Sequence, residues 1–505
     1  MKVIARDLAA RYFVGEVKYP AFFPTVYGRD RPSTEGVVVN VYRIWTDRES
    51  RKIVKKSVGE YLDYGGFVLP ESGWRQIDKY GDDDVANEDL VEIQAKMEFP
   101  VVAPLPSAKP DDAIINAEVA RSITDKPLFL EIPPSWTEKE VFAFVEATKG
   151  WAWGYGTRAG RSEFIELLVK TVPRSKRVVV FGIHHPAVIP VIVSLGVDVV
   201  TSGAHGRYAD KELYITESSI RPLGELKELP CGCKICDGRT PEDLGTKGDL
   251  LAEHNLISFV EEVKKTRNAI VEGRLYEYAK RRSLTHPQIY KDFKKVVASE
   301  WITENLPFPK QSSIYLFEKE CRPEIELGRS LAKKRGVRLE GLAYTYPFGQ
   351  VYPPIVEARP SPELVVRSVI KYQYGVDVNT SQLRWETRKG IPRKIYMGDK
   401  YLGLIRHGDG FFVPSIEGAK WLKEMAPPPA FRIVLDSEGV EAVRLKRSPL
   451  TDHVLDVDPD LRPNMEVIVT DEDDEVVATG RSVLTAREVA EIPRTVAVKI
   501  RHRAV

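Results

Sequence analysis

The chain contains 505 residues, of which 43% are hydrophobic, and carries 74 basic against 73 acidic side chains. At roughly 100–200 residues per domain this length predicts about three or four domains, and the apolar content excludes a disordered chain. The formal net charge of +1 excludes a protein that binds nucleic acid through bulk positive charge, so such binding would depend on local patches.

The sequence lacks the signals of a membrane or secreted protein. No stretch reaches the ~18–20 consecutive apolar residues of a membrane helix. The N-terminal segment includes Asp7 and lacks the apolar region of a signal peptide. The chain has four cysteines, three of them between positions 231 and 236, which is not the pattern of a secreted disulfide framework. We therefore expect a cytoplasmic protein with reduced thiols and no membrane contact.

The first 290 residues alternate between short apolar, β-branched runs and helix-like segments. Strands that alternate with helical segments of about 10–15 residues predict a parallel sheet with crossover helices. At this length a (β/α)8 barrel is the expected closure, and a doubly wound sheet is the alternative. The predicted strands lie at 38–45, 65–70, 99–106, 127–134, 176–183 and 196–203.

The pattern changes near residue 250. Residues 256–282 predict one long, highly charged amphipathic helix with Asn255 as its N-terminal cap. A mixed α+β region follows, and the proline-rich segment 426–430 is typical of a stiff linker. From residue 431 onward, short and closely spaced strands with polar turns predict a small β-barrel.

Three cysteines within six positions form the most specific local motif. Cys231, Cys233 and Cys236 make a CxCxxC pattern, and His254 follows 18 positions after the last of them. Three thiolates and one imidazole suit a tetrahedral ion, and soft sulfur ligands with no open coordination position favour zinc. We therefore predict one Zn²⁺ per chain in a structural role, with His286 as the alternative fourth ligand.

These motifs together resemble one known family. The CxCxxC motif, the downstream AEHNL (252–256) and the terminal segment LRPNMEVIVTDEDDEVVATGRSVL (461–484) are similar to those of the archaeal tRNA-guanine transglycosylases, the archaeosine branch of a barrel-fold family. The last 75 residues resemble a PUA domain. The resemblance implies a transglycosylase-like (β/α)8 barrel with a zinc-binding insertion at 1–297, two α+β accessory domains at 298–366 and 367–430, and a small β-barrel PUA domain that binds RNA at 431–505.

The resemblance also implies a chemistry that needs two carboxylates. The family exchanges a guanine in the tRNA D-arm for a 7-deazaguanine precursor; one aspartate attacks the ribose carbon, and another handles protons and the base edge. In this chain Thr201 occupies the nucleophile position and Glu71 the second position. Pro104 stands where a third aspartate is expected, and Glu131 begins the pair that replaces the base-reading Gln-Gly.

The change at Thr201 decides the predicted function. Threonine is a poor nucleophile without an adjacent base, and the loss of a nucleophile usually costs orders of magnitude in rate. Asp198 lies three residues earlier in the same strand and is therefore expected to point to the opposite face. We predict a tRNA-binding protein of archaeosine formation with Glu71 as the remaining candidate base. An active transglycosylase and a non-catalytic general RNA-binding protein are the alternatives.

Further polar residues lie near the ends of predicted strands. His184, His205 and Arg207 are candidates for facing the pocket, whereas His185 is expected to orient the helix that follows it. Cys321 is the one cysteine outside the motif. It is expected to be a packing residue, because the cysteine signature of archaeosine synthases is absent.

Contacts with tRNA are predicted at two places. Lys280, Arg281 and Arg282 form a basic run after the metal motif. The PUA-like segment holds 11 basic and 15 acidic residues, a net charge of −4, so binding there would depend on a few side chains, with Arg481 and Arg501 among them. The resemblance further implies a homodimer and, as a partner, an active transglycosylase or an archaeosine synthase.

Overall fold

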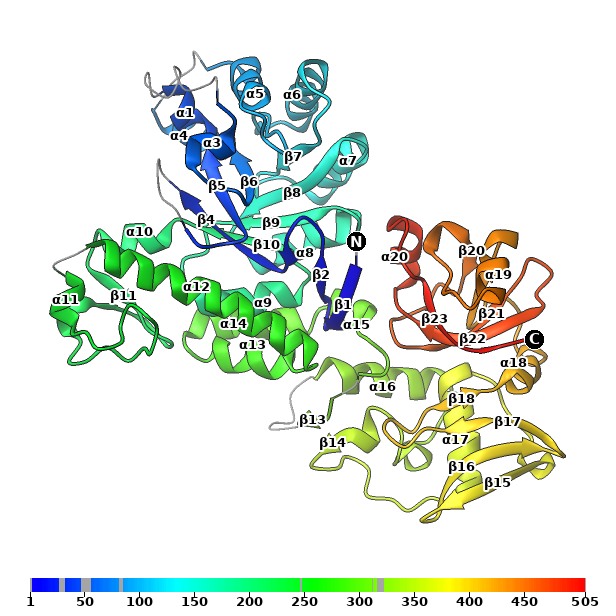
Figure 1. Cartoon of the computed structure of the whole chain (residues 1–505). Coiled ribbons are helices and arrows are strands. Elements are labelled where there is room, and N and C mark those ends of the chain that lie inside the picture. Colours follow the sequence, from blue (N-terminus) through cyan, green and yellow to red (C-terminus); the bar gives the residue numbers. More distant parts are fainter. Residues whose placement is uncertain are drawn as a thin grey trace. The chain divides into compact units, whose positions relative to one another are not determined.

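The computed structural model describes residues 2–26, 32–46, 56–80, 85–245, 248–310, 312–315 and 322–504. The chain forms two compact units, Lys2–Val296 and Val297–Val505, and each is described here by itself (Figure 1). Within the described ranges, no helix combines the length and apolar character that a membrane span requires.

The first unit is built around a parallel sheet that nearly closes into a barrel. Its seven strands lie in the order β6-β5-β4-β10-β9-β8-β7. The first of these strands in the chain, β4, pairs with the last, β10, as in a barrel and unlike a doubly wound sheet. The strand bounds are β4 Ala21–Val26, β5 Gly36–Asn40, β6 Phe67–Glu71, β7 Leu128–Glu131, β8 Ala152–Arg158, β9 Arg177–Phe181 and β10 Val199–Ser202.

The expected eighth strand is reduced to one bridge. Val102 makes an isolated parallel bridge with Leu128 at the start of β7. Its amide donates to the Pro127 carbonyl (3.0 Å), and its carbonyl accepts from the Phe129 amide (2.8 Å). The predicted barrel-type α/β fold is therefore confirmed, as a near-barrel with seven described strands.

Aromatic side chains fill the interior of this near-barrel. The ring of Phe67 on β6 stacks on Trp153 of β8 at 5.1 Å, although these strands are not neighbours in the sheet. Phe129 and Phe181 continue the cluster, with ring centroids 5.6 Å apart. A Cβ atom at Gly156 would lie 2.5 Å from the Phe129 ring, so glycine is required there for close packing.

Helices follow the strands as the sequence pattern predicts. The helix at Glu138–Thr148, α7, starts with a capping box, in which the Thr137 hydroxyl accepts from the Glu140 amide and the Glu140 carboxylate accepts from the Thr137 amide. An antiparallel sheet of β1 (Lys2–Asp7), β2 (Ala10–Val14) and β3 (Lys18–Tyr19) precedes the barrel. The other helices are α1 Val41–Thr46, α3 Val58–Leu62, α4 Trp74–Tyr80, α5 Asn87–Lys96, α6 Pro110–Ile123, α8 Ser162–Thr171 and α9 Ile189–Ser194.

The segment with the cysteine motif follows β10. Its long helix, α12, runs over Gly248–Val271, so the prediction of Asn255 as an N-terminal cap is wrong. Gly273, with φ of +66°, separates α12 from the next helix, which corrects the prediction of one helix over 256–282. The remaining elements are α10 Ala204–Ala209, β11 Leu213–Ile215, β12 Ile220–Pro222, η2 Leu223–Glu225, α11 Pro241–Gly245, α13 Leu275–Ser283 and α14 Pro287–Val297.

The terminal unit contains two larger sheets. Strands β15 to β18 form a four-stranded antiparallel sheet, and a five-stranded sheet has the order β20-β19-β21-β22-β23. Strand bounds are β13 Ile314–Tyr315, β14 Val351–Tyr352, β15 Leu383–Arg388, β16 Ile391–Met397, β17 Lys400–Ile405, β18 Phe412–Pro414, β19 Arg432–Leu435, β20 Val454–Val457, β21 Glu466–Thr470, β22 Val476–Ser482 and β23 Val498–Arg503. The α-helices are α15 Glu300–Asn305, α16 Pro323–Lys334, α17 Pro362–Tyr374, α18 Ile416–Lys423, α19 Ser437–Arg444 and α20 Ala486–Glu491.

A buried carboxylate lies at the start of α16. Glu324, which has no exposed surface, accepts from Lys310 Nζ (3.1 Å) and from the Arg322 guanidinium (3.2 and 3.3 Å). Burial alone would raise the pKa of Glu324, but Arg322 and Lys310 hold it at about 2. The site is therefore a buried ion triad that joins the segment before α16 to the helix.

Candidate functional site

Charged side chains meet where the parallel strands end. Glu71 is the last residue of β6, Glu131 the last of β7 and Arg158 the last of β8. The carboxyl ends of parallel strands lie at one edge of a barrel, which is where barrel enzymes bind their substrates. Sequence reasoning placed Glu71 here, but it did not identify Arg158 as a member of the site.

Glu71 is engaged by a guanidinium. The Arg158 side chain forms an ion pair with the Glu71 carboxylate, and the two side chains are 20% and 8% exposed. Glu131 lies in the same cluster, 6% exposed, with its carboxylate 3.4 Å from the Ser72 hydroxyl and hydrogen-bonded to the Trp74 side chain. The barrel end thus holds two carboxylates and an arginine whose charge acts on both.

The two carboxylates have unlike environments. Burial and the charge of Glu71 raise the pKa of Glu131 to about 7, although Arg158 opposes the shift. Glu131 is therefore a carboxyl group that binds a proton near neutral pH. A buried carboxyl group that keeps its proton near neutral pH is suited to acid–base chemistry.

The raised pKa of Glu131 has a consequence for stability. Because the folded state binds this proton more tightly than the unfolded chain, the carboxyl group increasingly destabilises the fold as the pH rises from about 4.5 to about 7. Glu131→Gln is therefore expected to raise the melting temperature relative to wild type more at about pH 8 than at about pH 5. Thermal unfolding at both pH values tests this, with the exposed Glu118→Gln as the control. An equal difference at the two pH values would contradict it.

Thr201 lies in the barrel wall and faces its interior. It is 1% exposed and pairs in register with Phe23 of β4, whose ring contacts the interior ring of Phe67 at 6.0 Å. Paired residues of neighbouring strands point to the same side, so the Thr201 side chain points inward with Phe23. The residue at the predicted nucleophile position is therefore placed at the barrel interior and brings a hydroxyl there.

Asp198 has a structural role. Its carboxylate binds the Arg11 guanidinium at 3.4 Å and accepts from the Val178 amide at 3.0 Å. Both oxygens are thereby used to join β9 and the N-terminal sheet to the start of β10. Pro104 is buried and contributes no carboxylate.

The histidines that follow β9 have different partners. His185 accepts from the Ala187 amide at 3.1 Å and caps a short 3-10 helix, η1, at Pro186–Val188, which confirms the predicted structural role. Burial and the charges of Arg282 and His286 lower the pKa of His185 to about 4. His184 lies 3.4 Å from the Arg207 guanidinium, so these two candidates are brought together.

The cysteine motif forms a cluster that could hold a metal ion. One ligand atom each from Cys231, Cys233, Cys236 and His254 lies within 4.8 Å of the others. His254 turns Nδ1 toward the sulfur atoms of Cys236 (3.3 Å) and Cys233 (3.6 Å). Among the described residues this set contains His254 rather than the alternative His286, whose Nδ1 accepts from the Gln288 amide.

Neighbouring groups orient the ligands of this cluster. Nε2 of His254 lies 2.9 Å from the Ile215 carbonyl, so the proton on Nε2 leaves the Nδ1 lone pair for a metal. The Tyr214 ring stacks on the imidazole with centroids 3.8 Å apart, and its hydroxyl lies 3.2 Å from Cys236 Sγ. Asn255 joins this support from α12, because its side chain bonds the Ile215 amide and the Leu213 carbonyl of β11. The donor set and its orientation fit a closed tetrahedral ion.

Curated relatives match the whole chain. A tRNA-guanine(15) transglycosylase of Pyrococcus abyssi is 28% identical over 99% of this chain and 97% of its own length. The protein of that name from Thermococcus kodakarensis is 28% identical over 92% of this chain and 90% of its own, and that from Methanococcus aeolicus is 24% identical over 96% of each.

Three family models match separate parts of the chain. Residues 142–288 match queuine tRNA-ribosyltransferase, residues 365–429 match the patch-forming domain C2 of tRNA-guanine transglycosylase, and residues 431–504 match the PUA domain. The chain is thus similar to tRNA-guanine transglycosylases over almost its whole length. The predicted PUA domain is confirmed, and the match to queuine tRNA-ribosyltransferase includes the four residues of the metal cluster.

The basic run after the metal cluster is divided between interior and surface. Arg282 on α13 is 4% exposed; it binds the Glu262 carboxylate at 2.8 Å and donates to the Glu217 carbonyl at 2.5 Å. Its guanidinium is thus used inside the protein. Arg281 is exposed, with its guanidinium 5.3 Å from the Tyr278 ring, and Lys280 lies on the same helix.

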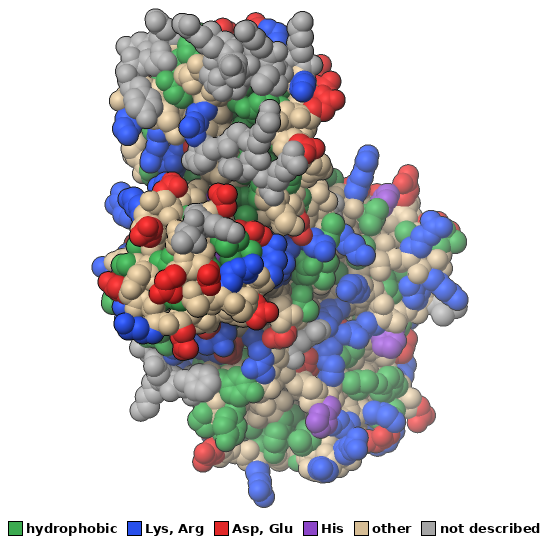
Figure 2. Space-filling model, turned by 60° about the vertical axis from the view of Figure 1, so that its left-hand side comes forward, with side chains coloured by type: hydrophobic (Ala, Val, Ile, Leu, Met, Phe, Trp, Pro, Cys, Tyr) green, Lys and Arg blue, Asp and Glu red, His purple; other side chains and the backbone are tan. Residues whose placement is uncertain are grey.

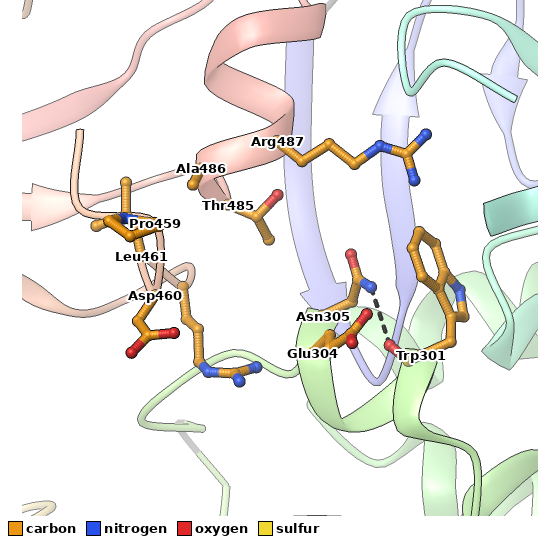
Figure 3. A pocket seen from close by; sticks show the side chains of 10 residues that line it. Trp301, Glu304, Asn305, Pro459, Asp460, Leu461, Thr485, Ala486 and Arg487 are labelled. Atoms are coloured by element: carbon orange, nitrogen blue, oxygen red, sulfur yellow. Dashed lines mark hydrogen bonds between the residues drawn. The ribbon is translucent and has the colours of Figure 1, made fainter. Parts of the chain in front are cut away.

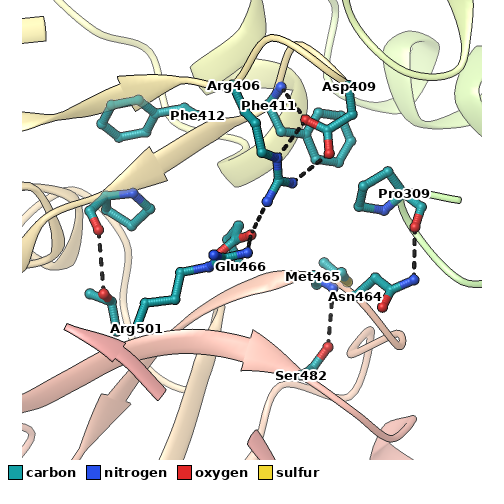
Figure 4. Close-up of polar contacts among 12 residues, drawn as sticks. Pro309, Arg406, Asp409, Phe411, Phe412, Asn464, Met465, Glu466, Ser482 and Arg501 are labelled. Carbon is teal, nitrogen blue, oxygen red and sulfur yellow. Dashed lines mark hydrogen bonds and ion pairs between the residues drawn. The ribbon is translucent and has the colours of Figure 1, made fainter. Parts of the chain in front are cut away.

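One carboxylate of the terminal unit binds an arginine from each of two domains. Arg501 binds Glu466 at 2.9 and 3.0 Å, and Arg406 from the C2 domain binds the same carboxylate at 2.8 Å (Figure 4). Arg481 lies beside them, and burial together with Arg406 lowers its pKa. Glu466 therefore balances part of the positive charge of Arg501 and Arg406 within the protein. On the face drawn in Figure 2, basic and acidic side chains are likewise mixed and form no single field of one sign.

The terminal unit also contains a polar cavity of about 290 Å³ (Figure 3). Arg487 of α20 lies over the Trp301 ring of α15, with the guanidinium carbon 5.6 Å from the ring centroid. Side chains of both signs line the cavity, so its charge does not select an anion; they are Glu304, Asp460, Arg462 and Arg487. Cys321, predicted as a packing residue, lies outside the described residues.

Proposed function

We propose that this chain is a tRNA-binding protein that acts in 7-deazaguanine (archaeosine) modification without exchanging the base itself. The observation that carries the proposal is the engaged barrel end: Glu71 is paired with Arg158, and Thr201 supplies a hydroxyl at the nucleophile position. The family match and the relatives, which are named for action on tRNA guanine, support the tRNA substrate.

The chemistry of the barrel end supports a loss of exchange activity. A threonine hydroxyl needs a nearby base to attack a sugar carbon, and it would leave a much less labile bond than a carboxylate ester. The Glu71 carboxylate shares its lone pairs with the Arg158 guanidinium, which occupies the space beside it. Asp198 is held by Arg11 and the Val178 amide and is not placed to replace the nucleophile.

One observation favours a second candidate, an active transglycosylase. Glu131 brings a second carboxyl group to Glu71, and its pKa of about 7 suits a proton donor or acceptor at neutral pH. In this candidate Glu131 would take the proton-handling role and Glu71, once released by Arg158, the role of the attacking carboxylate. The third alternative is a general RNA-binding protein that has no role in base modification.

Exchange of labelled guanine into a tRNA transcript separates these candidates. The wild type is expected to incorporate no label above a sample without protein. Arg158→Gly combined with Thr201→Asp is expected to gain exchange, because it frees Glu71 and restores a carboxylate at the nucleophile position. Robust incorporation by the wild type that Glu71→Gln and Glu131→Gln each abolish would replace the proposal by the second candidate.

Zinc is the ion that we propose for the metal cluster. Three thiols and an imidazole with no open position match a structural site, and Cys231, Cys233, Cys236 and His254 would hold the ion. When bound, zinc would supply a cross-link between the cysteine loop and α12 rather than a reactive centre. We further propose that the protein is cytoplasmic and forms a homodimer. Its proposed partner is an active transglycosylase or an archaeosine synthase, and Lys280 and Arg281 are proposed to contact RNA.

A further inference from the structure

The sheet of the C2 domain carries a concentration of positive charge. Residues 383–405, which span β15 to β17, contain six Lys or Arg and two Asp or Glu, a net charge of +4. The PUA segment that follows has a net charge of −4. The sequence-based search for basic runs missed this segment, because its charges are spread over three short strands.

Pairing of the strands brings basic and aromatic residues onto one face. Arg384 pairs with Tyr396 across β15 and β16, and Tyr396 pairs with Tyr401 across β16 and β17, so all three side chains share one side of the sheet. The Arg384 guanidinium lies 4.4 Å from the Tyr396 ring centroid, and the two tyrosine rings are 5.5 Å apart. We call Arg384, Lys394, Tyr396 and Tyr401 the hairpin face.

The hairpin face is the open side of this sheet. Ile395, which points to the other side, is fully buried, and α17 packs against β16 while α18 packs against β17. Arg384 and Lys394 are exposed, and Tyr396 and Tyr401 keep part of their surface accessible. Figure 1 shows β15, β16 and β17 side by side with α17 along them. Arg388 at the end of β15 and Lys389 in the turn that follows add two exposed cations.

These groups have the chemistry of a surface for unpaired nucleotides. Tyrosine rings offer planar surfaces on which bases stack, and arginine and lysine neutralise the phosphates between them. Glu386 accepts from the Tyr396 hydroxyl (2.8 Å) and pairs with Lys394 (3.2 Å), but this exposed pair contributes little stability and can give way to a phosphate. A duplex presents no free base faces, so the match is to RNA whose bases are unpaired.

We propose that the hairpin face binds RNA where unpaired bases lie beside the phosphate backbone. This inference rests on the proposed function, in which the chain binds tRNA, and it identifies the surface that would contact the RNA. Arg501 of the PUA domain is less suited, because Glu466 already binds its guanidinium.

Tyr396 gives the sharpest test, because two substitutions separate stacking from hydrogen bonding. Binding of the full chain to a labelled tRNA transcript and to a single-stranded RNA oligonucleotide is measured by fluorescence anisotropy. Tyr396→Ala is expected to weaken both by about five- to a hundredfold, whereas Tyr396→Phe, which keeps the ring, stays within about twofold. Circular dichroism checks that both variants fold.

Charge substitutions test the phosphate contacts. Arg384→Ala with Arg388→Ala is expected to weaken binding and to reduce the slope of log K against log salt by about 1–2. Arg367→Ala, on the helix that covers the other side of the sheet, removes an arginine of similar exposure and is expected to leave both unchanged.

The outcomes distinguish this inference from the proposed function. Wild-type binding of tRNA that Tyr396→Ala and the arginine variant leave unchanged would overturn the hairpin face and retain tRNA binding. Wild-type binding of the oligonucleotide alone, lost in Tyr396→Ala, would support the hairpin face and overturn the tRNA assignment. A chain that binds neither RNA would overturn both, and equal losses in the two Tyr396 variants would refute base stacking.

Discussion

Replacing Cys236 by alanine is expected to lower the metal content from about one ion per chain to none, because a structural site needs all four ligands. Structural zinc contributes ~10–16 kcal/mol to the folding of small zinc domains, so the loss is large wherever the surrounding core is small. Here the buried apolar residues around the cluster are few, and Tyr214, Leu223, Leu244 and Leu251 are among them. We therefore expect the cysteine loop and the β11–β12 hairpin to lose order while the barrel strands stay folded.

Metal analysis and amide hydrogen exchange check this expectation. Fast exchange should appear in residues 210–245 and leave the barrel strands protected. Tyr214→Phe is the matched control: it keeps the stack on His254 but removes the hydroxyl 3.2 Å from Cys236 Sγ. It should still bind one ion, with an affinity lower by about 10–100-fold. Unchanged metal content in Cys236→Ala would refute the site.

Glu324→Gln is expected to destabilise the terminal unit by about 3–5 kcal/mol. The glutamine fits the same space but removes the negative charge that Lys310 and Arg322, both nearly fully buried, share. Glu326→Gln on the same helix is the control, because its partner Arg329 is about half exposed and such surface pairs contribute ~0–1 kcal/mol. Denaturant unfolding, followed by hydrogen exchange within the terminal unit, measures both variants.

The stability difference between wild type and Glu324→Gln depends on pH in one direction only. The pKa of Glu324 is lowered from 4.5 to about 2, so its stabilisation is fully present above the unfolded value and is lost as the pH falls through the folded one. The difference between wild type and Glu324→Gln should therefore be constant at neutral pH and shrink as the pH falls below about 4.5 toward about 2. A difference that grows in acid would contradict the assignment.

The sequence predicted features that depend on local spacing. The CxCxxC pattern and a histidine 18 positions later were sufficient to predict the metal cluster, since three ligands in one short loop must lie close together. Apolar β-branched runs likewise predicted the parallel strands β5, β6, β7, β9 and β10, but not β4 or β8, and the range predicted for β5 extended into helix α1. Thr201 and Glu71 were placed at the barrel end by comparison with family motifs.

Pairings between distant segments could not be predicted in this way. Glu71 and Arg158 are 87 positions apart, and their contact depends on the register of β6 and β8 around the barrel. Arg282 is part of a basic run in the sequence, yet the packing of α13 against α12 buries it on Glu262. Asn255 resembles a helix cap, but the helix begins earlier and turns its side chain toward β11. In each case the deciding fact is which faces of the elements meet.

The carboxylate of Glu466 has a consequence for modularity. It is 1% exposed and is shared by Arg501 of the PUA domain and Arg406 of the C2 domain (Figure 4). An isolated fragment of residues 431–505 would keep Glu466 and Arg501 but lose Arg406. The cut would also break the hydrogen bonds from the Phe308 amide to the Pro463 carbonyl and from Asn464 to the Pro309 carbonyl. The PUA domain therefore cannot be exchanged freely for another one in this chain. A foreign PUA domain would need a carboxylate at the position of Glu466 to bind Arg406.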